Sequence, residues 1–342
     1  TVKLDRPLFN EAYLMHTSTS PQYSIIASCD VAAAMMEPPG GTAMVEESIL
    51  EALDFRRAMR KVDEEYGSDW WFKVWGPDAL VEEGIGRADD WIIRGDRRGR
   101  KGSQWHGFGK LADGFNMLDP IKATIVTPGL NLNGTFEKTG IPASIVTKFL
   151  AEHGVVVEKT GLYSFFIMFT IGITKGRWNT LLTALQQFKD DYDKNQSMWR
   201  IMPEFCQKFP RYERMGLRDL CQHVHEMYAR HDIARLTTEM YLSELAPAMK
   251  PADAYAHIAH RQTERVEIDH LEGRVTVGLV TPYPPGIPLL IPGEVFNRKI
   301  VDYLKFSREF NRQCPGFETD IHGLVEEKGP DGIKRFFADC VR

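Results

Sequence analysis

The sequence predicts an α/β protein with more than one domain, and three observations support this. The chain has 342 residues, 43% of them hydrophobic, which is enough to bury two or three cores. Its middle third alternates helix and strand patterns, and the strands are continuous apolar runs, as in buried strands. After about Lys194 helical patterns dominate, which indicates a second and more helical region.

The first two predicted helices are separated by a short stretch of helix-breaking residues. Residues 9–36 contain the small, apolar stretch SIIASCDVAAAMM, whose Ala and Met content predicts a tightly packed helix. Two Pro and two Gly in residues 37–42 (EPPGGT) mark a boundary or hinge. Thr42 is then the expected cap of a long helix that reaches Tyr66 and ends at Gly67.

The middle of the chain contains the clearest alternation of helices and strands. A helix is expected from Pro142 to His153, because Pro favours the first turn and Gly154 stops the helix. Another helix is expected from Trp178 to Tyr192. Four strands are expected, at residues 69–75 (DWWFKVW), 121–129 (IKATIVTPG), 155–161 (VVVEKTG) and 164–174 (SFFIMFTIGIT).

The last third is mainly helical up to Tyr255. EIDHLEGRVTVGLV, residues 267–280, predicts a pair of strands that turns at Gly273. Five prolines in residues 281–294 (TPYPPGIPLLIPGE) exclude a helix and make a central strand unlikely there. A helix is expected over residues 301–313.

Composition excludes several classes of function. A net charge of -5 and a pI of about 6.1 give no basic surface for nucleic acid. No apolar stretch approaches the roughly 18 residues that a membrane span needs. Five scattered cysteines without CxxC spacing fit a reducing cytoplasm, so we expect a cytoplasmic protein without disulfides.

No complete active site is visible in the motifs. His223 and His225 are two apart, so on a helix they point to different faces and cannot share a metal. His257 and His260 share a face, but no carboxylate stands in HExxH register. The sequence also lacks GxGxxG, GxxxxGK[ST] and GxSxG motifs. We therefore expect no metal site and no self-contained catalytic centre.

Seven short motifs follow one another along the whole chain. They are FNEAYLMHTSTSPQY, AAAMM, WHGF, MLDPIKATIVTPG, GIPASIVTKFLAEHGVVVEKTG, PYPPGIPLLIPGE and PGFETDIHG. Each is weak alone, but in this order the chain resembles the C-terminal half of the bacterial biodegradative lysine/arginine/ornithine decarboxylases. These are pyridoxal-phosphate enzymes of the aspartate-aminotransferase fold, also called fold type I. The hydroxyl run and the last motif look closest to the lysine type.

The resemblance implies three structural parts. Residues 1–38 would be the end of the large cofactor-binding domain. Residues 39–194 would form the small aminotransferase-like domain, and residues 195–342 a C-terminal α+β decarboxylase domain. The resemblance also implies that an N-terminal half is missing, and that the enzyme is a homodimer assembled further into a decamer of dimers.

The resemblance places the covalent anchor of the cofactor outside this chain. In the family, the Schiff-base lysine lies in a Ser-x-His-Lys motif, roughly twenty residues before the position that Thr1 would occupy. This sequence contains no His-Lys dipeptide. We therefore expect no catalytic residue here and no activity from the chain alone, because the lysine holds the cofactor and exchanges with substrate.

The hydroxyl run Ser18, Thr19 and Ser20 is the expected cofactor contact. From spacing alone, these residues brace or cap a turn before Pro21. The resemblance implies instead that their hydroxyls donate hydrogen bonds to the phosphate of pyridoxal phosphate across a dimer interface. Both interpretations stay open at this point.

Glu158, in VVVEKTG, is the expected substrate contact. A basic amino acid carries a distal cation, and a carboxylate at the far end of the pocket would recognise it. The resemblance matches Glu158 to a residue that reads the substrate side chain. The alternative is a solvent-facing glutamate paired with Lys159.

Two hypotheses about function follow. In the first, the chain is part of a decarboxylase that converts lysine, or alternatively ornithine or arginine, to an amine and CO2. That reaction consumes a proton and would serve acid resistance and polyamine supply. In the second, the chain is a non-catalytic partner that regulates a full-length decarboxylase. The start at Thr1, without an initiator Met, favours the first hypothesis and a processed or truncated product.

Overall fold

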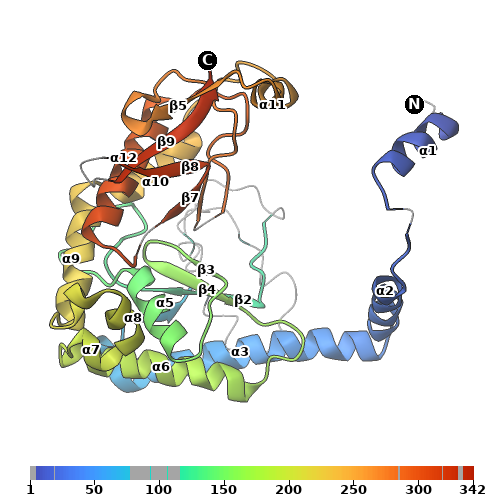
Figure 1. Ribbon diagram of the computed structural model, residues 1–342. Helices are drawn as coiled ribbons and strands as arrows, with labels where there is room; N and C mark the ends of the chain where they lie inside the picture. Colours follow the sequence, from blue (N-terminus) through green and yellow to red (C-terminus); the bar gives the residue numbers. More distant parts are fainter. Residues whose placement is uncertain are drawn as a thin grey trace, which may run out of the picture.

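The chain forms a body with a separate N-terminal arm (Figure 1). The computed structural model describes residues 5–18, 20–77, 93, 106, 116–283, 286–317, 319–329 and 334–342. The arm, residues 5–36, contains helices α1 (Arg6–Met15) and α2 (Tyr23–Met35). The body contains all later elements, and Figure 1 shows its C-terminus on the side opposite α6.

The arm is helical as expected, but it is not packed. Neither α1 nor α2 has a buried residue. Apolar side chains that a core would normally take up are exposed, including Met15 at 81% and Tyr23 at 78%. The expectation of a tightly packed helix was therefore wrong within the described residues, because none of them covers the arm.

Helix α3 (Gly40–Tyr66) connects the arm to the body. It ends as predicted at Gly67, which adopts φ 59°, a conformation that glycine tolerates best. Its start differs from the prediction, because Thr42 lies inside the helix and Pro39 occupies the capping position. The amide of Gly41 already donates to the carbonyl of Glu37 at 2.9 Å, so the first turn forms before Thr42.

A four-stranded antiparallel sheet forms the centre of the body. Its order is β1-β2-β4-β3. The strands are β1 (Lys73–Val74), β2 (Lys122–Val126), β3 (Lys159–Thr160) and β4 (Ser164–Met168). Three helices pack against the sheet or against one another beside it: α3, α5 (Ala143–Glu152) and α6 (Lys175–Asp193). The mixed helix and strand content confirms the coarse α/β prediction, although the expected strands were too long.

The four-stranded sheet and helices α3, α5 and α6 together form what we call the α/β layer. Its core lies on the face of the sheet that the helices cover. Ala123, Ile125 and Phe165 are at most 1% exposed, whereas the residues that alternate with Ala123 and Ile125 along β2 are half-buried (Thr124, Val126) or exposed (Lys122). This alternation follows from the two-residue period of a strand. Figure 1 shows α6 running along the same side as α3.

Hydrogen bonds from Arg56 connect α3 to the sheet. Its side chain is buried, and its Nη1 and Nη2 donate to the carbonyls of Trp75 at 2.9 Å and Lys122 at 3.1 Å. Within the described residues no carboxylate pairs with it, and burial lowers the pKa of Arg56 to about 10. The guanidinium thus satisfies two carbonyls at the edge of the sheet rather than forming an ion pair.

Polar contacts connect α6 to α9 (Leu217–Arg230), the first long helix of the C-terminal region. Asn195 adopts φ 48° just after α6, and its Oδ1 accepts the amide of Arg218 at 2.9 Å. The Arg218 guanidinium donates back to the carbonyls of Tyr192 and Asp193 in the last turn of α6. The end of one helix and the start of the next therefore satisfy each other's free backbone groups.

The C-terminal region is helical first and then mixed. Its helices are α7 (Met198–Ile201), α8 (Pro203–Lys208), α9 (Leu217–Arg230), α10 (Ile233–Leu242), α11 (Pro251–Ala259) and α12 (Arg298–Gln313). One antiparallel sheet has the order β5-β9-β8, with β5 (Thr263–Glu267), β8 (Leu324–Lys328) and β9 (Lys334–Val341). A second pairs β6 (Thr281–Tyr283) with β7 (Asp320–His322).

The predicted strand pair around Gly273 was wrong. Residues 268–270 form a 3₁₀ turn, and Val275 bridges to Val295 rather than to a residue before the turn. Strand β5 instead pairs with β9 at the far end of the chain. Long-range pairing has therefore replaced the local hairpin that the sequence suggested.

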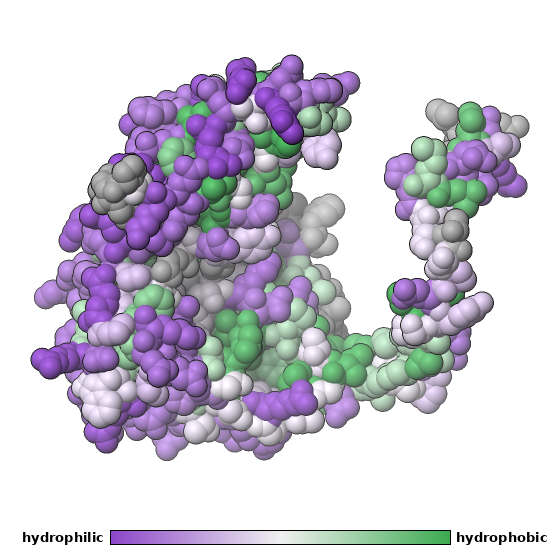
Figure 2. Space-filling view, viewed as in Figure 1, coloured by the Kyte–Doolittle hydropathy of each residue, from purple (hydrophilic) through white to green (hydrophobic). Residues whose placement is uncertain are grey.

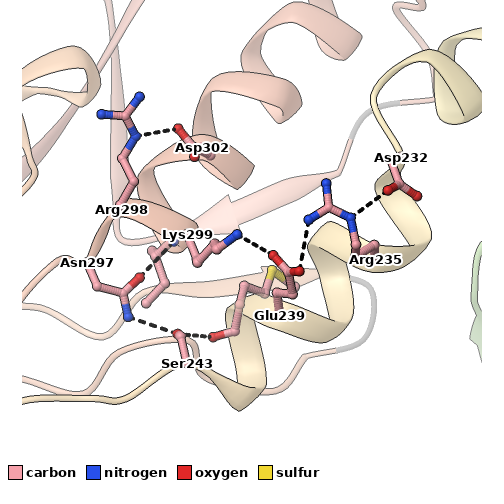
Figure 3. A network of polar contacts seen from close by, with 10 residues as sticks. Asp232, Arg235, Glu239, Ser243, Asn297, Arg298, Lys299 and Asp302 are labelled. Atoms are coloured by element: carbon pink, nitrogen blue, oxygen red, sulfur yellow. Dashed lines mark hydrogen bonds and ion pairs between the residues drawn. The ribbon is translucent and has the colours of Figure 1, made fainter.

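Helices α10 and α12 are joined by a polar network (Figure 3). Glu239 on α10 accepts from Arg235 at 2.9 Å and from Lys299 on α12. Hydrogen bonds from Lys299 and Arg235 lower the pKa of Glu239. Asn297 caps α12 through the amide of Ile300 and reaches the Ser243 hydroxyl at the end of α10. These contacts fix the register of the two helices.

A buried tyrosine–histidine pair joins the α/β layer to the C-terminal helices. The Tyr163 hydroxyl, beside β4, lies 2.6 Å from Nδ1 of His225 on α9. Nε2 of His225 lies 3.0 Å from the carbonyl oxygen of Glu137, which can only accept. In the neutral imidazole Nε2 therefore carries the proton, and Nδ1 accepts from Tyr163. Both side chains are buried, and burial raises the pKa of Tyr163.

Two glycines make room for this pair. A Cβ on Gly140 would lie 2.2 Å from Nδ1 of His225, and a Cβ on Gly129 would lie 2.4 Å from the Tyr163 ring. Gly129 also has φ 128°, which an L side chain rarely adopts. The loop between β2 and α5 thus passes the pair at a distance that only glycine allows.

We expect Gly140→Ala to lower the free energy of unfolding by about 1–3 kcal/mol, because the new methyl group displaces a buried, hydrogen-bonded imidazole. Urea unfolding of the two proteins measures this difference. Gly176→Ala is the matched control, since a Cβ there meets nothing within 4 Å and Gly176 lies in α6. That control should be neutral or stabilising by up to about 1 kcal/mol. Equal stability of the Gly140 variant and wild type would contradict the tight contact.

Candidate functional site

The hydroxyl run lies in the arm, between α1 and α2. Ser18 and Ser20 are exposed, and Thr19 lies outside the described residues. The Oγ of Ser18 accepts the amide of Ser20 at 3.1 Å and lies 3.4 Å from the Ser20 carbonyl. Ser18 thus braces its own turn, as the spacing predicted, while both hydroxyls remain accessible to an external acceptor.

Residues before the run are held by α1. The Thr17 hydroxyl donates to the carbonyl of Tyr13 at 3.0 Å, and Nδ1 of His16 contacts the carbonyl of Ala12 at 2.7 Å. These bonds close the end of α1. Ser18 therefore follows directly on a helix end that two side-chain contacts hold.

Both helices of the arm expose apolar side chains. Figure 2 shows hydrophobic residues along both of its helical segments. The exposed apolar side chains of α1 and α2 include Leu8, Phe9, Leu14, Ile25, Ile26, Val31 and Met35. Full burial of one such side chain contributes about 1.5–3 kcal/mol of stabilising free energy, which is not gained while the side chain stays in water. A surface of this kind is typical of an element that packs on another domain or subunit.

Glu158 lies immediately before β3, at the edge of the sheet. Its amide donates to the carbonyl of Phe166 at 2.9 Å, so the hairpin with β4 fixes its backbone. The side chain is exposed. No ion pair joins it to Lys159 in the described part of the chain, since neighbouring residues at a strand point to opposite sides. Of the alternative interpretation, the solvent-facing glutamate is observed, whereas the ion pair with Lys159 is not found among the described residues.

The structure does not bring the hydroxyl run and Glu158 together. The arm extends away from the body, and Figure 1 shows α1 and α2 far from β3. A single copy of this chain therefore does not assemble the two expected contacts into one pocket.

The structure places His223 and His225 on α9. His223 is exposed and His225 is buried, so the two point to different faces of α9 as predicted. The role of His225 as the partner of Tyr163 was not predicted. In the described ranges, no group of three or more His, Cys, Asp or Glu side chains is arranged to hold a metal ion.

The buried cysteines are not nucleophiles. Burial raises the pKa of Cys206 and Cys314 to about 11 and that of Cys340 to about 12, so these thiols stay protonated at neutral pH. Burial also raises the pKa of Cys221. Cys29, in the arm, is exposed.

None of the helices in the described ranges combines the length and apolar character needed to cross a bilayer.

Comparison with known families accounts for most of the chain. The Orn/Lys/Arg decarboxylase major domain matches residues 1–177, and the Orn/Lys/Arg decarboxylase C-terminal domain matches residues 234–342. The chain belongs to the Orn/Lys/Arg decarboxylase family. This confirms the family resemblance that the seven sequence motifs indicated.

Individual relatives within this family are lysine decarboxylases. Lysine decarboxylase LdcA of Pseudomonas aeruginosa is 46% identical over 347 aligned residues, which cover 100% of this chain and 45% of LdcA. The inducible lysine decarboxylase of Escherichia coli K12 is 40% identical, over 93% of this chain and 44% of that enzyme. The chain therefore spans less than half the length of the curated relatives that it matches.

Solved structures agree with this assignment. Lysine decarboxylase A from Pseudomonas aeruginosa superposes with a TM-score of 0.91 at 46% identity, covering 100% of this chain and 45% of that one. The E. coli constitutive lysine decarboxylase gives 0.87 at 35% identity, covering 100% of this chain and 46% of that one. The arrangement of arm and body is thus shared with decarboxylases more than twice as long.

Proposed function

We propose that this chain is the C-terminal portion of a pyridoxal-phosphate-dependent decarboxylase that converts lysine to cadaverine and CO2. The observation that carries the proposal is the match of both family domains in order, together with lysine decarboxylases 46% and 40% identical over 93% or more of the chain. Lysine is preferred over ornithine and arginine on the same ground. The enzyme would act in the cytoplasm, where proton consumption supports acid resistance.

The proposed domain division is the one expected from the resemblance. Residues 1–38 complete the large cofactor-binding domain, residues 39–194 form the small domain, and residues 195–342 form the C-terminal domain. The exposed arm supports the first boundary, because α1 and α2 have no buried residue within this chain. The end of α6 at Asp193 lies next to the second boundary.

The exposed apolar side chains of the arm favour a partner that covers them in the intact enzyme. We propose that the arm packs against the N-terminal half and against a second subunit, giving a homodimer and a decamer of dimers. Its exposed apolar side chains would be buried there. The separation of the arm from β3 fits a site completed by a neighbouring subunit (Figure 1).

The hydroxyl run fits a phosphate. Ser18 and Ser20 are exposed, have only local hydrogen-bond partners, and are rotatable donors. Together with Thr19 they would hold the phosphate of pyridoxal phosphate by hydroxyl donation. When bound, the cofactor supplies an electron sink for loss of the α-carboxylate as CO2. The described residues of this chain would position the cofactor and leave its covalent attachment to a lysine elsewhere.

Glu158 fits the distal end of the substrate. A carboxylate there would bind the side-chain ammonium of lysine and compensate the hydration that the ammonium loses. The β3–β4 hairpin would hold this carboxylate in place through the amide of Glu158. The role of Glu158 is thus recognition and orientation, without proton transfer.

The chain alone should not decarboxylate lysine. It contains no His-Lys dipeptide, so the expected anchor of the cofactor is absent from it. Assaying CO2 release from lysine with added pyridoxal phosphate checks this, and no release above background is expected. Activity of the isolated chain, or a borohydride-stable cofactor adduct on one of its lysines, would overturn this part of the proposal.

In the full-length enzyme, changing Ser18, Thr19 and Ser20 together to Ala should weaken cofactor retention. Each hydroxyl–phosphate hydrogen bond contributes about 1.5–3 kcal/mol, because the acceptor is charged. Equilibrium dialysis of pyridoxal phosphate measures the loss. Ser28→Ala is the matched control, since the Ser28 hydroxyl is exposed in α2 and donates to the carbonyl of Ile25. Unchanged affinity in a folded triple mutant would leave the run with its turn-bracing role alone.

In the same enzyme, Glu158→Gln should lower kcat/KM for lysine at least tenfold, which corresponds to about 1.4 kcal/mol. The amide keeps the shape but removes the charge that pairs with the desolvated ammonium. Cofactor absorbance should not change. Steady-state kinetics with lysine, ornithine and arginine measure the effect, with Glu213→Gln, an exposed carboxylate in the C-terminal region, as control. If all three substrates stay within twofold of wild type, Glu158 is a surface residue.

A further inference from the structure

A large cavity lies between the α/β layer and the C-terminal helices. Its volume is about 770 Å³, within the range of small-molecule sites. Helices α5, α8, α9, α10 and α12 and the turn after β3 surround it. Neither the hydroxyl run nor Glu158 lines it. It is therefore distinct from the contacts proposed for cofactor and substrate.

Eight aromatic side chains line part of the cavity wall. Phe306 stacks on Phe310 at 5.7 Å between ring centroids, and Tyr228 lies 5.3 Å from Phe310. Phe205 and Phe317, which also line the cavity, lie 4.9 Å apart between ring centroids. Rings that hold one another in this way give a preformed apolar wall, which a ligand can occupy without first ordering it.

Polar atoms are placed at a few points of this wall. The Ser144 hydroxyl oxygen is buried and has no hydrogen-bond partner of normal geometry, although it lies close enough to Tyr228 to affect the pKa of that phenol. Tyr303 and Tyr228 also line the cavity, and burial is the main cause that raises the pKa of both hydroxyls. These hydroxyl groups place hydrogen-bonding atoms in an otherwise largely apolar part of the lining.

Four charged side chains line the cavity: Lys148 and Glu152 on α5, and Glu204 and Lys208 on α8. Lys148, Glu204 and Lys208 are exposed, so these charges lie at the mouth. None of the four forms an ion pair with another residue in the described ranges. Glu152 accepts the amide of Phe205 at 2.7 Å, which leaves its second oxygen available. Both signs of charge are thus available beside the aromatic wall.

We propose that this cavity binds a free amino acid with an apolar, aromatic or branched side chain. The apolar side chain would lie against the aromatic wall, and the ammonium and carboxylate would pair with Glu and Lys side chains at the mouth. A lysine side chain fits less well, because the carboxylates that line the cavity in the described residues stand on α5 and α8 rather than among the rings of α12. The ligand class therefore differs from that of the proposed substrate.

Isothermal titration of the full-length enzyme with L-phenylalanine tests the proposal. We expect saturable binding to wild type and at least tenfold weaker binding of phenethylamine and of 3-phenylpropanoate, which each carry one charge. Ala151→Trp, on the cavity side of α5, should fill the space and weaken L-phenylalanine binding at least tenfold. Ala252→Trp on α11 is the matched control, exposed and outside the cavity lining, and should bind as wild type does.

Several results would overturn the proposal. The first is a titration with L-phenylalanine that gives no saturable heat. The second is that phenethylamine or 3-phenylpropanoate binds as tightly as L-phenylalanine does. The third is that L-phenylalanine binds wild type and Ala151→Trp equally tightly. If Ala151→Trp does not fold, Lys148→Gln at the exposed mouth replaces it and should weaken binding at least fivefold. The readout is binding rather than decarboxylation, so a failure here is distinguishable from a failure of the proposed function.

Discussion

The hydrogen bond between Tyr163 and His225 is the contact on which the arrangement of the body depends. It joins the hairpin of the α/β layer to α9, the first long helix of the C-terminal region. His225 also contacts the carbonyl of Glu137, so the loop between β2 and α5 is tied to the same ring. Three segments far apart in sequence therefore meet at one imidazole, and Gly129 and Gly140 leave the space that it needs. Glu158 lies immediately before this hairpin, and Tyr228, on the same helix as His225, lines the cavity.

The proposed functional groups lie where the chain packs least against itself. The hydroxyl run is on an arm with no buried residue, and Glu158 is exposed at the edge of the sheet. A self-contained active site would bury and pair such groups. Their exposure, and the match to less than half the length of the relatives, fit a site that further protein completes. The body, by contrast, has an extensive core that includes Phe149, Phe188 and Phe296, and this core supports the hairpin beside Glu158.

Local features of the sequence predicted the helices well and strand pairing poorly. The ends of α3 and α5 followed from Gly67 and Gly154, because such signals act within one turn. The pairing of β5 with β9 links Thr263 to Val341, and no local pattern encodes a partner so distant. Tyr163 and His225 are 62 positions apart, so His225 looked like an ordinary histidine. Ser18, Ser20 and Glu158 rest on the family resemblance, since their spacing alone equally suits turn and surface residues.

A double-mutant cycle on Tyr163→Phe and His225→Leu tests most directly whether this pair holds the body together. The free energies of unfolding of wild type, both single mutants and the double mutant would be measured in urea. A direct, buried hydrogen bond predicts that the two changes are not additive, with a coupling energy of about 1 kcal/mol or more, because either change alone already breaks the contact. Additivity within about 0.3 kcal/mol would contradict the account, since the two residues would then act independently.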